Sequence, residues 1–239
     1  MSQTIPIVEN IMNANEQLAQ QNRARLDDAS IFAVNFMASP GAGKTSLIEQ
    51  TLKRISAEIK VAAVDGDIAT SIDADRAAAA GATAIQINTG GGCHLDAVML
   101  RNALYQLGNL AQFDLLIVEN VGNLICPAAF QLGTHKSILI ASVPEGDDKP
   151  YKYPGMYSDV DALVINKIDL LPYIPFKMDY FRQGVEILSP NLVTFPLSCQ
   201  TGEGIDEWID WLSSIPSPVW HESEKVTKFG PRISTPWRK

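Results

Sequence analysis

The sequence has 239 residues, 46% of them hydrophobic, which is enough for one α/β domain with a substantial buried core. Acidic residues outnumber basic ones 27 to 19, and this excess argues against general electrostatic binding to nucleic acid or to an anionic membrane. No apolar run has the length of a membrane span, the first residues do not form a signal peptide, and three cysteines are too few for a disulfide framework. We therefore expect a cytoplasmic protein.

Apolar segments alternate with helical patterns along the chain. Residues Ile5 to Leu26 mix apolar side chains with Asn, Gln and Glu, which predicts a polar-faced helix. Segments typical of buried strands are Ile31–Met37 and those that begin at Val61, Ala84, Phe113, Ser137, Ala162 and Leu192. Helical patterns cover Thr45–Ile55, Ile72–Ala80, His94–Leu107, Phe176–Leu188 and Ile205–Leu212. This alternation predicts an α/β fold, with a mostly parallel sheet and helices on both of its faces.

A phosphate-binding motif follows the first predicted strand. The sequence A-S-P-G-A-G-K-T fits G-x-x-x-x-G-K-[ST], with Ala38 where the pattern has its first Gly. Glycines let the loop turn its backbone N–H groups towards phosphate oxygens, and the next helix presents its N-terminus to them. Lys44 would reach the β- and γ-phosphates, and the Thr45 hydroxyl would hold Mg²⁺. The predicted phosphate-binding residues are Gly41, Ala42, Gly43, Lys44, Thr45 and Ser46.

A second motif predicts which base is bound. Asn166, Lys167 and Asp169 close a predicted strand in the order N-K-I-D, which fits the N-K-x-D motif of GTPases. A carboxylate at Asp169 can accept both the N1–H and the 2-amino group of guanine, whereas adenine offers no matching pair of donors. After another strand, Ser198, Cys199 and Gln200 are similar to the loop that backs the guanine ring. A P-loop small-molecule kinase is the alternative, and it would not need N-K-I-D.

Carboxylates at two further strand ends are candidates for the catalytic machinery. Asp65-Gly66-Asp67 ends the second predicted strand, where a carboxylate can join the Mg²⁺ shell through water. Glu119-Asn120-Val121-Gly122 is similar to the D-x-x-G segment, whose glycine N–H senses the γ-phosphate. The candidate catalytic residues are Lys44, Thr45, Asp67, Asp73 and Glu119, and the candidate Mg²⁺ ligands are Thr45, Asp67 and Glu119.

Two cysteines and a histidine form a candidate metal site. Cys93 and His94 lie at the predicted start of a helix, after a Gly-rich loop, and Cys126 lies four residues beyond Gly122. A helix N-terminus lowers the pKa of a thiol, and two thiolates with an imidazole suit Zn²⁺ or Ni²⁺. Spacing alone favours buried cysteines and a capping histidine instead.

The sequence resembles the HypB family, the GTPases that help insert nickel into [NiFe]-hydrogenase. The resemblance rests on Gln86–Gly90 with Cys93–Ala97, on Val118–Pro127 and on Glu145–Lys149, together with the P-loop and N-K-I-D. It implies a SIMIBI-class P-loop fold with GTPase activity. The motifs predict binding of GTP and GDP with Mg²⁺, and hydrolysis should be slow because the sequence offers no obvious arginine finger near the switch segments. The resemblance also implies a GTP-dependent homodimer with Ni²⁺ or Zn²⁺ on Cys93, His94 and Cys126. The partners implied are a nickel chaperone and the hydrogenase large subunit.

Two departures and one rival family bear on this resemblance. Gly91 stands where many family members have lysine, and residues 1–29 contain no Cys or His, so we expect no tight nickel storage there. The urease-accessory GTPases typically carry Cys-Pro-His, whereas Cys93 and His94 are adjacent here. We expect an N-terminal helical extension over 1–29, a GTPase domain with the metal site over 30–215, and a loosely packed tail over 216–239.

Overall fold

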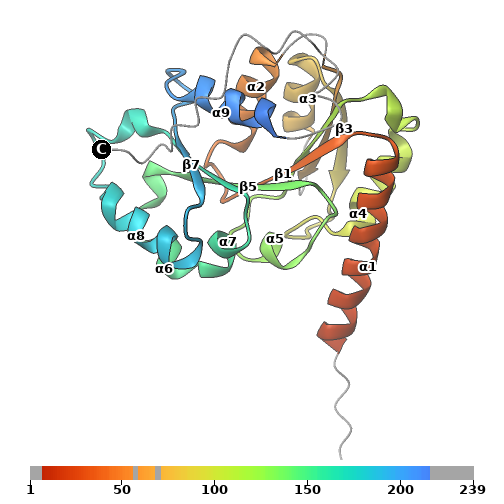
Figure 1. Ribbon diagram of the computed structural model, residues 1–239, viewed down its shortest axis with the longest axis horizontal. Helices are drawn as coiled ribbons and strands as arrows, with labels where there is room; N and C mark the ends of the chain where they lie inside the picture. The colour runs from red at the N-terminus through yellow and green to blue at the C-terminus, as the bar shows by residue number, and fades with distance from the viewer. Residues whose placement is uncertain (1–6, 56–58, 68–70, 216–239) are drawn as a thin grey trace, which may run out of the picture.

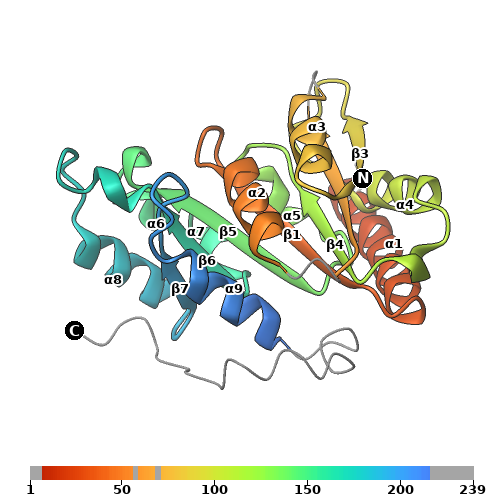
Figure 2. The ribbon, with the colours of Figure 1, turned by 90° about the horizontal axis from the view of Figure 1, so that it is seen from above.

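A seven-stranded, all-parallel sheet with the order β3-β2-β4-β1-β5-β6-β7 forms the centre of the molecule (Figure 2). The computed structural model describes residues 7–55, 59–67 and 71–215, so the predicted tail lies outside the described residues. The strands are β1 Phe32–Ala38, β2 Val61–Asp67, β3 Thr83–Asn88, β4 Leu115–Glu119, β5 Lys136–Ser142, β6 Ala162–Asn166 and β7 Val193–Pro196. Each of the seven predicted strands is confirmed.

The helices connect these strands. The longer ones are α1 Ile7–Asp28, α2 Lys44–Arg54, α3 Ile72–Ala79, α4 Ala97–Gln106, α8 Met178–Leu188 and α9 Ile205–Ser214. The sequence patterns did not predict the short helices α5 Cys126–Ala129, α6 Lys149–Lys152 and α7 Pro154–Ser158, or the 3₁₀ turns η1 Leu110–Gln112, η2 Val143–Glu145 and η3 Ile168–Leu170. Among the described helices, none combines the length and the hydropathy needed to span a bilayer.

Helices cover both faces of the sheet because successive side chains of a strand point to opposite faces. In β1, Phe32, Val34 and Phe36 pack into one core with α2 and α9, while Ala33 packs on the other face with α1 and α4. Met37 also points to that second face, where it packs with α7 and α8. Figure 1 shows α2, α3 and α9 on one side of the sheet and α1, α5 and α7 on the other.

The polar-faced helix α1 is anchored through buried asparagines. Asn22 Nδ2 donates to the carbonyls of Ala97 at 2.9 Å and Leu132 at 3.0 Å. Asn15 Oδ1 accepts from the Ala97 N–H at 2.9 Å. A buried amide without partners would cost about 1–3 kcal/mol, so these contacts define where α1 docks and where α4 begins.

Parallel strands place their carboxyl ends along one edge of the sheet. The P-loop follows β1, and Asp65-Gly66-Asp67 forms the carboxyl end of β2. The Glu119–Gly122 segment and N-K-I-D begin at the last residues of β4 and β6. Ligands of open α/β sheets bind outside this edge. The fold therefore gathers motifs that are far apart in the sequence.

Candidate nucleotide and metal site

The P-loop and the N-K-I-D motif are in direct contact. Asn166 Nδ2 donates to the Ala42 carbonyl at 2.9 Å, and Lys167 Nζ donates to the Gly41 carbonyl at 2.6 Å. Gly43 has φ +102°, and a Cβ at this position would lie 2.3 Å from Asn166 Nδ2. Glycine is therefore required there both for its backbone conformation and for the approach of Asn166.

A pocket of about 270 Å³ opens between these two motifs. Its lining comprises Gly43, Ser46, Asn166, Lys167, Asp169, Leu170, Cys199 and Gln200. All of these except Leu170 were predicted to bind the nucleotide. The pocket therefore lies where a base joined to phosphates at the P-loop would bind.

Hydrogen bonds fix the polar groups of this pocket. Ser198 Oγ donates to Asp169 Oδ1 at 2.5 Å and accepts from the backbone N–H groups of Gln200 and Thr201. The other carboxylate oxygen of Asp169 has no hydrogen bond to Ser198. Burial raises the pKa of the Cys199 thiol to about 11, so this thiol stays protonated at neutral pH.

Three carboxylates meet beside the P-loop. Asp65, Asp73 and Glu119 each place an oxygen within 4.8 Å of the other two. The β2–β4 register sets Asp65 opposite Glu119, and α3 supplies Asp73. Thr45 Oγ1 donates to Glu119 Oε1 at 2.7 Å. This set contains Asp65 and not Asp67, although Asp67 is the residue predicted from the sequence as the Mg²⁺ ligand at the end of this strand. The candidate residues Thr45, Asp73 and Glu119 are therefore brought together.

The electrostatics of this cluster fit a divalent cation. Burial raises the pKa of Asp65 and of Glu119 to about 7, although Lys44 acts in the opposite direction on both. Asp65 Oδ2 is buried without a hydrogen-bond partner. A cation would supply the missing partner and offset the excess of negative charge. Thr45, Asp65, Asp73 and Glu119 are hard oxygen donors, so they would hold Mg²⁺.

The segment after β4 lies against the P-loop. Asn123 N–H donates to the Ala38 carbonyl at 2.8 Å, and a Cβ on Gly122 would lie 3.0 Å from Pro40 Cα. We call residues 120–126 the switch loop. The contact between the switch loop and the P-loop places the Gly122 backbone beside the phosphate-binding turn. This position is needed if the Gly122 N–H is to sense the γ-phosphate.

Cys93, His94 and Cys126 lie together at the end of the switch loop. Cys93 Sγ lies 3.0 Å from Cys126 Sγ and 3.6 Å from His94 Nδ1, and the three ligand atoms lie within 4.8 Å of one another. The His94 ring stacks on Phe130 with 3.9 Å between the ring centroids. Burial lowers the pKa of His94, which favours the neutral imidazole that binds metals. This trio of soft and borderline donors suits Ni²⁺ or Zn²⁺.

The prediction that a helix begins at His94 is wrong. Helix α4 begins at Ala97, and Asp96 is its N-cap, with Oδ1 accepting from the Met99 N–H at 2.8 Å. Asn120 Oδ1 instead accepts from the Leu95 N–H at 3.0 Å, which holds the preceding backbone outside the helix. Cys93 therefore does not lie at a helix N-terminus. Cys126 is the metal-site residue that begins a helix, the short α5.

The switch loop holds the Cys93–Leu95 segment through two asparagines. Asn120 is 1% exposed, and its Oδ1 accepts from the N–H groups of both Leu95 and Val121 at 3.0 Å. Asn123 Nδ2 donates to the Cys93 carbonyl at 3.3 Å. A shift of the switch loop would therefore act on both segments that carry the metal-site residues.

The fold and the site together define a P-loop nucleotide-binding protein of the GTPase type with an adjacent cysteine–histidine site. The model of the CobW/HypB/UreG nucleotide-binding domain matches residues 32–193. The hydrogenase maturation factor HypB of Azotobacter vinelandii is 43% identical over 211 residues, which cover 88% of this chain and 69% of that protein. The chain belongs to the HypB family of hydrogenase maturation factors.

Two further relatives agree with this assignment. The probable hydrogenase maturation factor HypB of Methanocaldococcus jannaschii is 40% identical over 208 residues, covering 87% of this chain and 94% of that protein. The crystal structure of HypB from Helicobacter pylori in complex with nickel has a TM-score of 0.78 and 36% identity. That similarity covers 83% of this chain and 93% of the Helicobacter pylori chain.

Sequence reasoning missed several residues of the site. Asp65 shares a strand face with Asp67, but only the pairing of β2 with β4 shows which of the two meets Glu119. Asn120 looked like a variable position of the D-x-x-G pattern, although its side chain joins two loops. Arg76, which contacts Asp73, lies in an ordinary helical pattern that gave no signal.

Proposed function

We propose that this protein is a cytoplasmic GTP-hydrolysing metallochaperone that delivers nickel during [NiFe]-hydrogenase maturation. The single observation that carries the proposal is the switch loop. Glu119, immediately before it, belongs to the carboxylate cluster, and Cys126, at its end, belongs to the cysteine–histidine trio. Nucleotide and nickel would therefore act on the same short segment.

The P-loop and the pocket supply the groups for binding and hydrolysing GTP. Lys44 would bind phosphate oxygens, and Asp169 would select guanine. Mg²⁺ would neutralise charge on the transferred phosphoryl group while the four oxygen donors of its site hold it. Turnover would be slow, because Arg76, an arginine beside the cluster, is already paired with Glu49 and Asp73.

Hydrolysis would change the nickel site through the switch loop. Loss of the γ-phosphate removes the group that Gly122 would sense, so the loop can move relative to the P-loop. Cys126 would then shift, and the Asn120 and Asn123 contacts would carry the movement to Leu95 and Cys93. Metal affinity would differ between nucleotide states, and by linkage the metal would change nucleotide affinity by the same factor.

A GTP-dependent homodimer would complete the metal site. Cys93 is exposed, so a two-fold axis beside it could bring three ligands from each chain together. Lys149 or Lys152 would reach the partner's nucleotide, for which Lys152 must leave its ion pair with Asp148.

Nickel would be the cargo and Zn²⁺ a competitor, with a nickel chaperone and the hydrogenase large subunit as partners. The nickel complex of the Helicobacter pylori relative supports this choice of metal.

Dimerisation has a direct test. Sedimentation of the protein with GDP and with a GTP analogue, at tens of micromolar as an order-of-magnitude concentration for a weak interface, should show a dimer only with the analogue. A strict monomer in both states would contradict the proposed dimer.

Nickel binding is tested with the Cys93→Ala/Cys126→Ala double variant, which keeps Cys199 as an internal control thiol. We expect the variant to lose Ni²⁺ affinity by more than about tenfold, because two thiolate ligands disappear. Its affinity for GDP without added metal should match that of the wild type, since neither cysteine lines the nucleotide pocket. Unchanged Ni²⁺ affinity would show that the metal binds elsewhere.

A further inference from the structure

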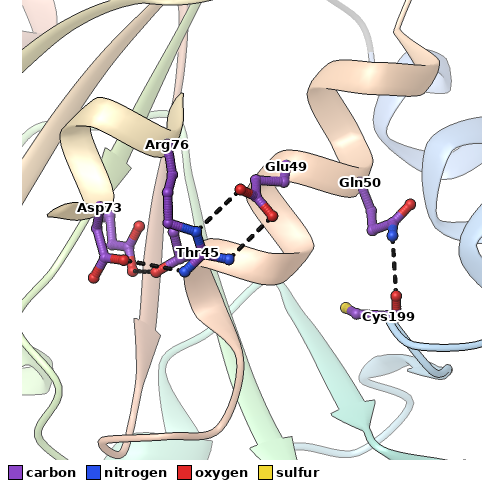
Figure 3. A network of polar contacts seen from close by, with 7 residues as sticks. Thr45, Glu49, Gln50, Asp73, Arg76 and Cys199 are labelled. Atoms are coloured by element: carbon purple, nitrogen blue, oxygen red, sulfur yellow. Dashed lines mark hydrogen bonds and ion pairs between the residues drawn. The ribbon is translucent and has the colours of Figure 1, made fainter. Parts of the chain in front are cut away.

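Arg76 lies between Glu49 and Asp73, beside the carboxylate cluster (Figure 3). Arg76 Nε and Nη2 each donate to one carboxylate oxygen of Glu49 at 3.0 Å, in the two-point geometry that guanidinium and carboxylate favour. Its remaining nitrogen, Nη1, donates to Asp73 Oδ1 at 3.2 Å. One side chain of α3 therefore joins helix α2 to a carboxylate of the candidate cation site.

These contacts link α2, α3 and β4 in a ring of residues that lies beside the cation site. Glu49 follows Thr45 by four residues on α2, so the two side chains lie on the same face of the helix. Thr45 Oγ1 in turn donates to Glu119, whose carboxylate lies within 4.8 Å of that of Asp73. Each member of the ring except Arg76 and Glu49 offers an oxygen to the cation.

Arg76 also offsets repulsion that would otherwise move Asp73 away. Asp73 comes from α3, whereas Asp65 and Glu119 come from the sheet, so the position of this carboxylate depends on how α3 docks. Without Arg76, Asp73 would face the two other carboxylates of the cluster, with Glu49 left unpaired near it. Bidentate pairing restrains the guanidinium more strongly than a single-point ion pair does, although both partners are partly exposed.

We propose that Arg76, braced by Glu49, is a positioning residue that holds Asp73 in place for the Mg²⁺ of the bound nucleotide. This inference rests on the proposed binding of a magnesium–guanine nucleotide complex. Arg76 does not touch the cation. It fixes the angle at which α3 presents Asp73 to the cluster, and through Glu49 it ties that angle to the helix that carries Lys44 and Thr45.

A role of Arg76 through its charge and a role through positioning predict opposite changes in divalent-cation affinity when Arg76 is replaced. If Arg76 acted only through its charge, Arg76→Gln would remove a repulsion and tighten the binding of a divalent cation. If Arg76 positions Asp73, the same variant releases that ligand and weakens binding. Arg76→Lys separates the two effects further, because lysine keeps the charge but cannot make the two-point contact with Glu49.

The experiment measures Mn²⁺ binding to the GDP-bound full chain by electron paramagnetic resonance. We expect Arg76→Gln to weaken Mn²⁺ binding about tenfold and Arg76→Lys about threefold, an order-of-magnitude expectation for loss of charge-assisted contacts. Glu49→Gln should add little to Arg76→Gln in the double variant, because both residues act through one contact. The matched control is Arg182→Gln, since Arg182 also pairs with an aspartate three residues earlier, on α8. That control should bind Mn²⁺ like the wild type.

Each outcome has a distinct meaning. Unchanged or tighter Mn²⁺ binding by Arg76→Gln, or wild-type binding by Arg76→Lys, would overturn the positioning role. Failure of the wild-type protein to bind GDP, or to bind Mn²⁺ with it, would instead contradict the proposed function. GDP affinity in EDTA and circular dichroism report folding, and Arg76→Lys provides the test if Arg76→Gln does not fold.

Discussion

Replacing Gly43 with alanine tests the contact between the P-loop and the base-binding motif. Two costs follow from the structure. An L-residue at φ +102° is strained by about 1–3 kcal/mol. The new Cβ would also lie 2.3 Å from Asn166 Nδ2, so the amide must move and lose its hydrogen bond to Ala42. A buried amide left unpaired costs about 1–3 kcal/mol more.

Gly41→Ala is the matched control for this variant. Gly41 also has a positive φ, +76°, but a Cβ there meets nothing within 4 Å, so only the conformational cost applies. The difference between the two variants therefore isolates the displacement of Asn166. We expect Gly43→Ala to have the lower free energy of unfolding, by about 1–3 kcal/mol, equivalent to about 2–12 °C in Tm for a chain of this size.

Thermal unfolding and GDP titration of both variants provide the assay. Asn166 lines the nucleotide pocket, so Gly43→Ala should also lose more affinity for GDP than Gly41→Ala does. Equal Tm losses in the two variants, or wild-type GDP binding by Gly43→Ala, would show that the contact between Gly43 and Asn166 does not limit stability or binding.

Three further predictions concern the charged groups of the site. Lys44→Ala should abolish GTP hydrolysis while circular dichroism shows an intact fold, and full turnover would mean that the phosphates bind elsewhere. Asp169→Asn should weaken GTP binding and admit xanthine nucleotides, whose 2-oxo group accepts a hydrogen bond where the guanine 2-amino group donates one. Unchanged GTP affinity would show that Asp169 does not bind the base. Burial raises the pKa of Asp65 from 3.8 and of Glu119 from 4.5 to about 7, so the folded metal-free protein holds these protons more tightly than the unfolded chain. Its stability should therefore fall as pH rises from about 4 to 7, by an amount on the order of a few kcal/mol. Urea unfolding in EDTA should show this fall for the wild type and a smaller one for Asp65→Asn, and identical slopes would contradict it.

The strands and the motifs were predictable because they depend on local sequence. Apolar, β-branched runs form buried strands wherever they pack, and the P-loop and N-K-I-D carry their chemistry within a few consecutive residues. Parallel topology then requires these motifs to lie at one edge of the sheet, so the pocket between Gly43 and Asn166 followed from the pattern.

The remaining features depend on pairings between distant segments. Asp96, the N-cap of α4, is a local signal for the start of this helix. The backbone around it is held by Asn15 and Asn120, which lie 82 and 25 residues from the N–H groups they accept from. The choice of Asp65 depends on the register between β2 and β4, and the role of Arg76 depends on how α3 docks on α2. No local pattern contains such information, because periodicity and spacing describe one element at a time.

Titration of the protein with Ni²⁺ in its nucleotide-free, GDP-bound and GTP-analogue-bound forms measures the coupling between the nucleotide site and the nickel site. All three titrations use one buffer, and a parallel series with Zn²⁺ tests whether the coupling depends on preferred coordination geometry. Because the switch loop joins Glu119 to Cys126, we expect Ni²⁺ affinity to differ between the GDP and GTP-analogue forms. A coupling of about 5-fold or more is the typical scale for linked sites, and nucleotide affinity must change with Ni²⁺ by the same factor. Equal Ni²⁺ affinities in all three forms would show that the two sites are not coupled.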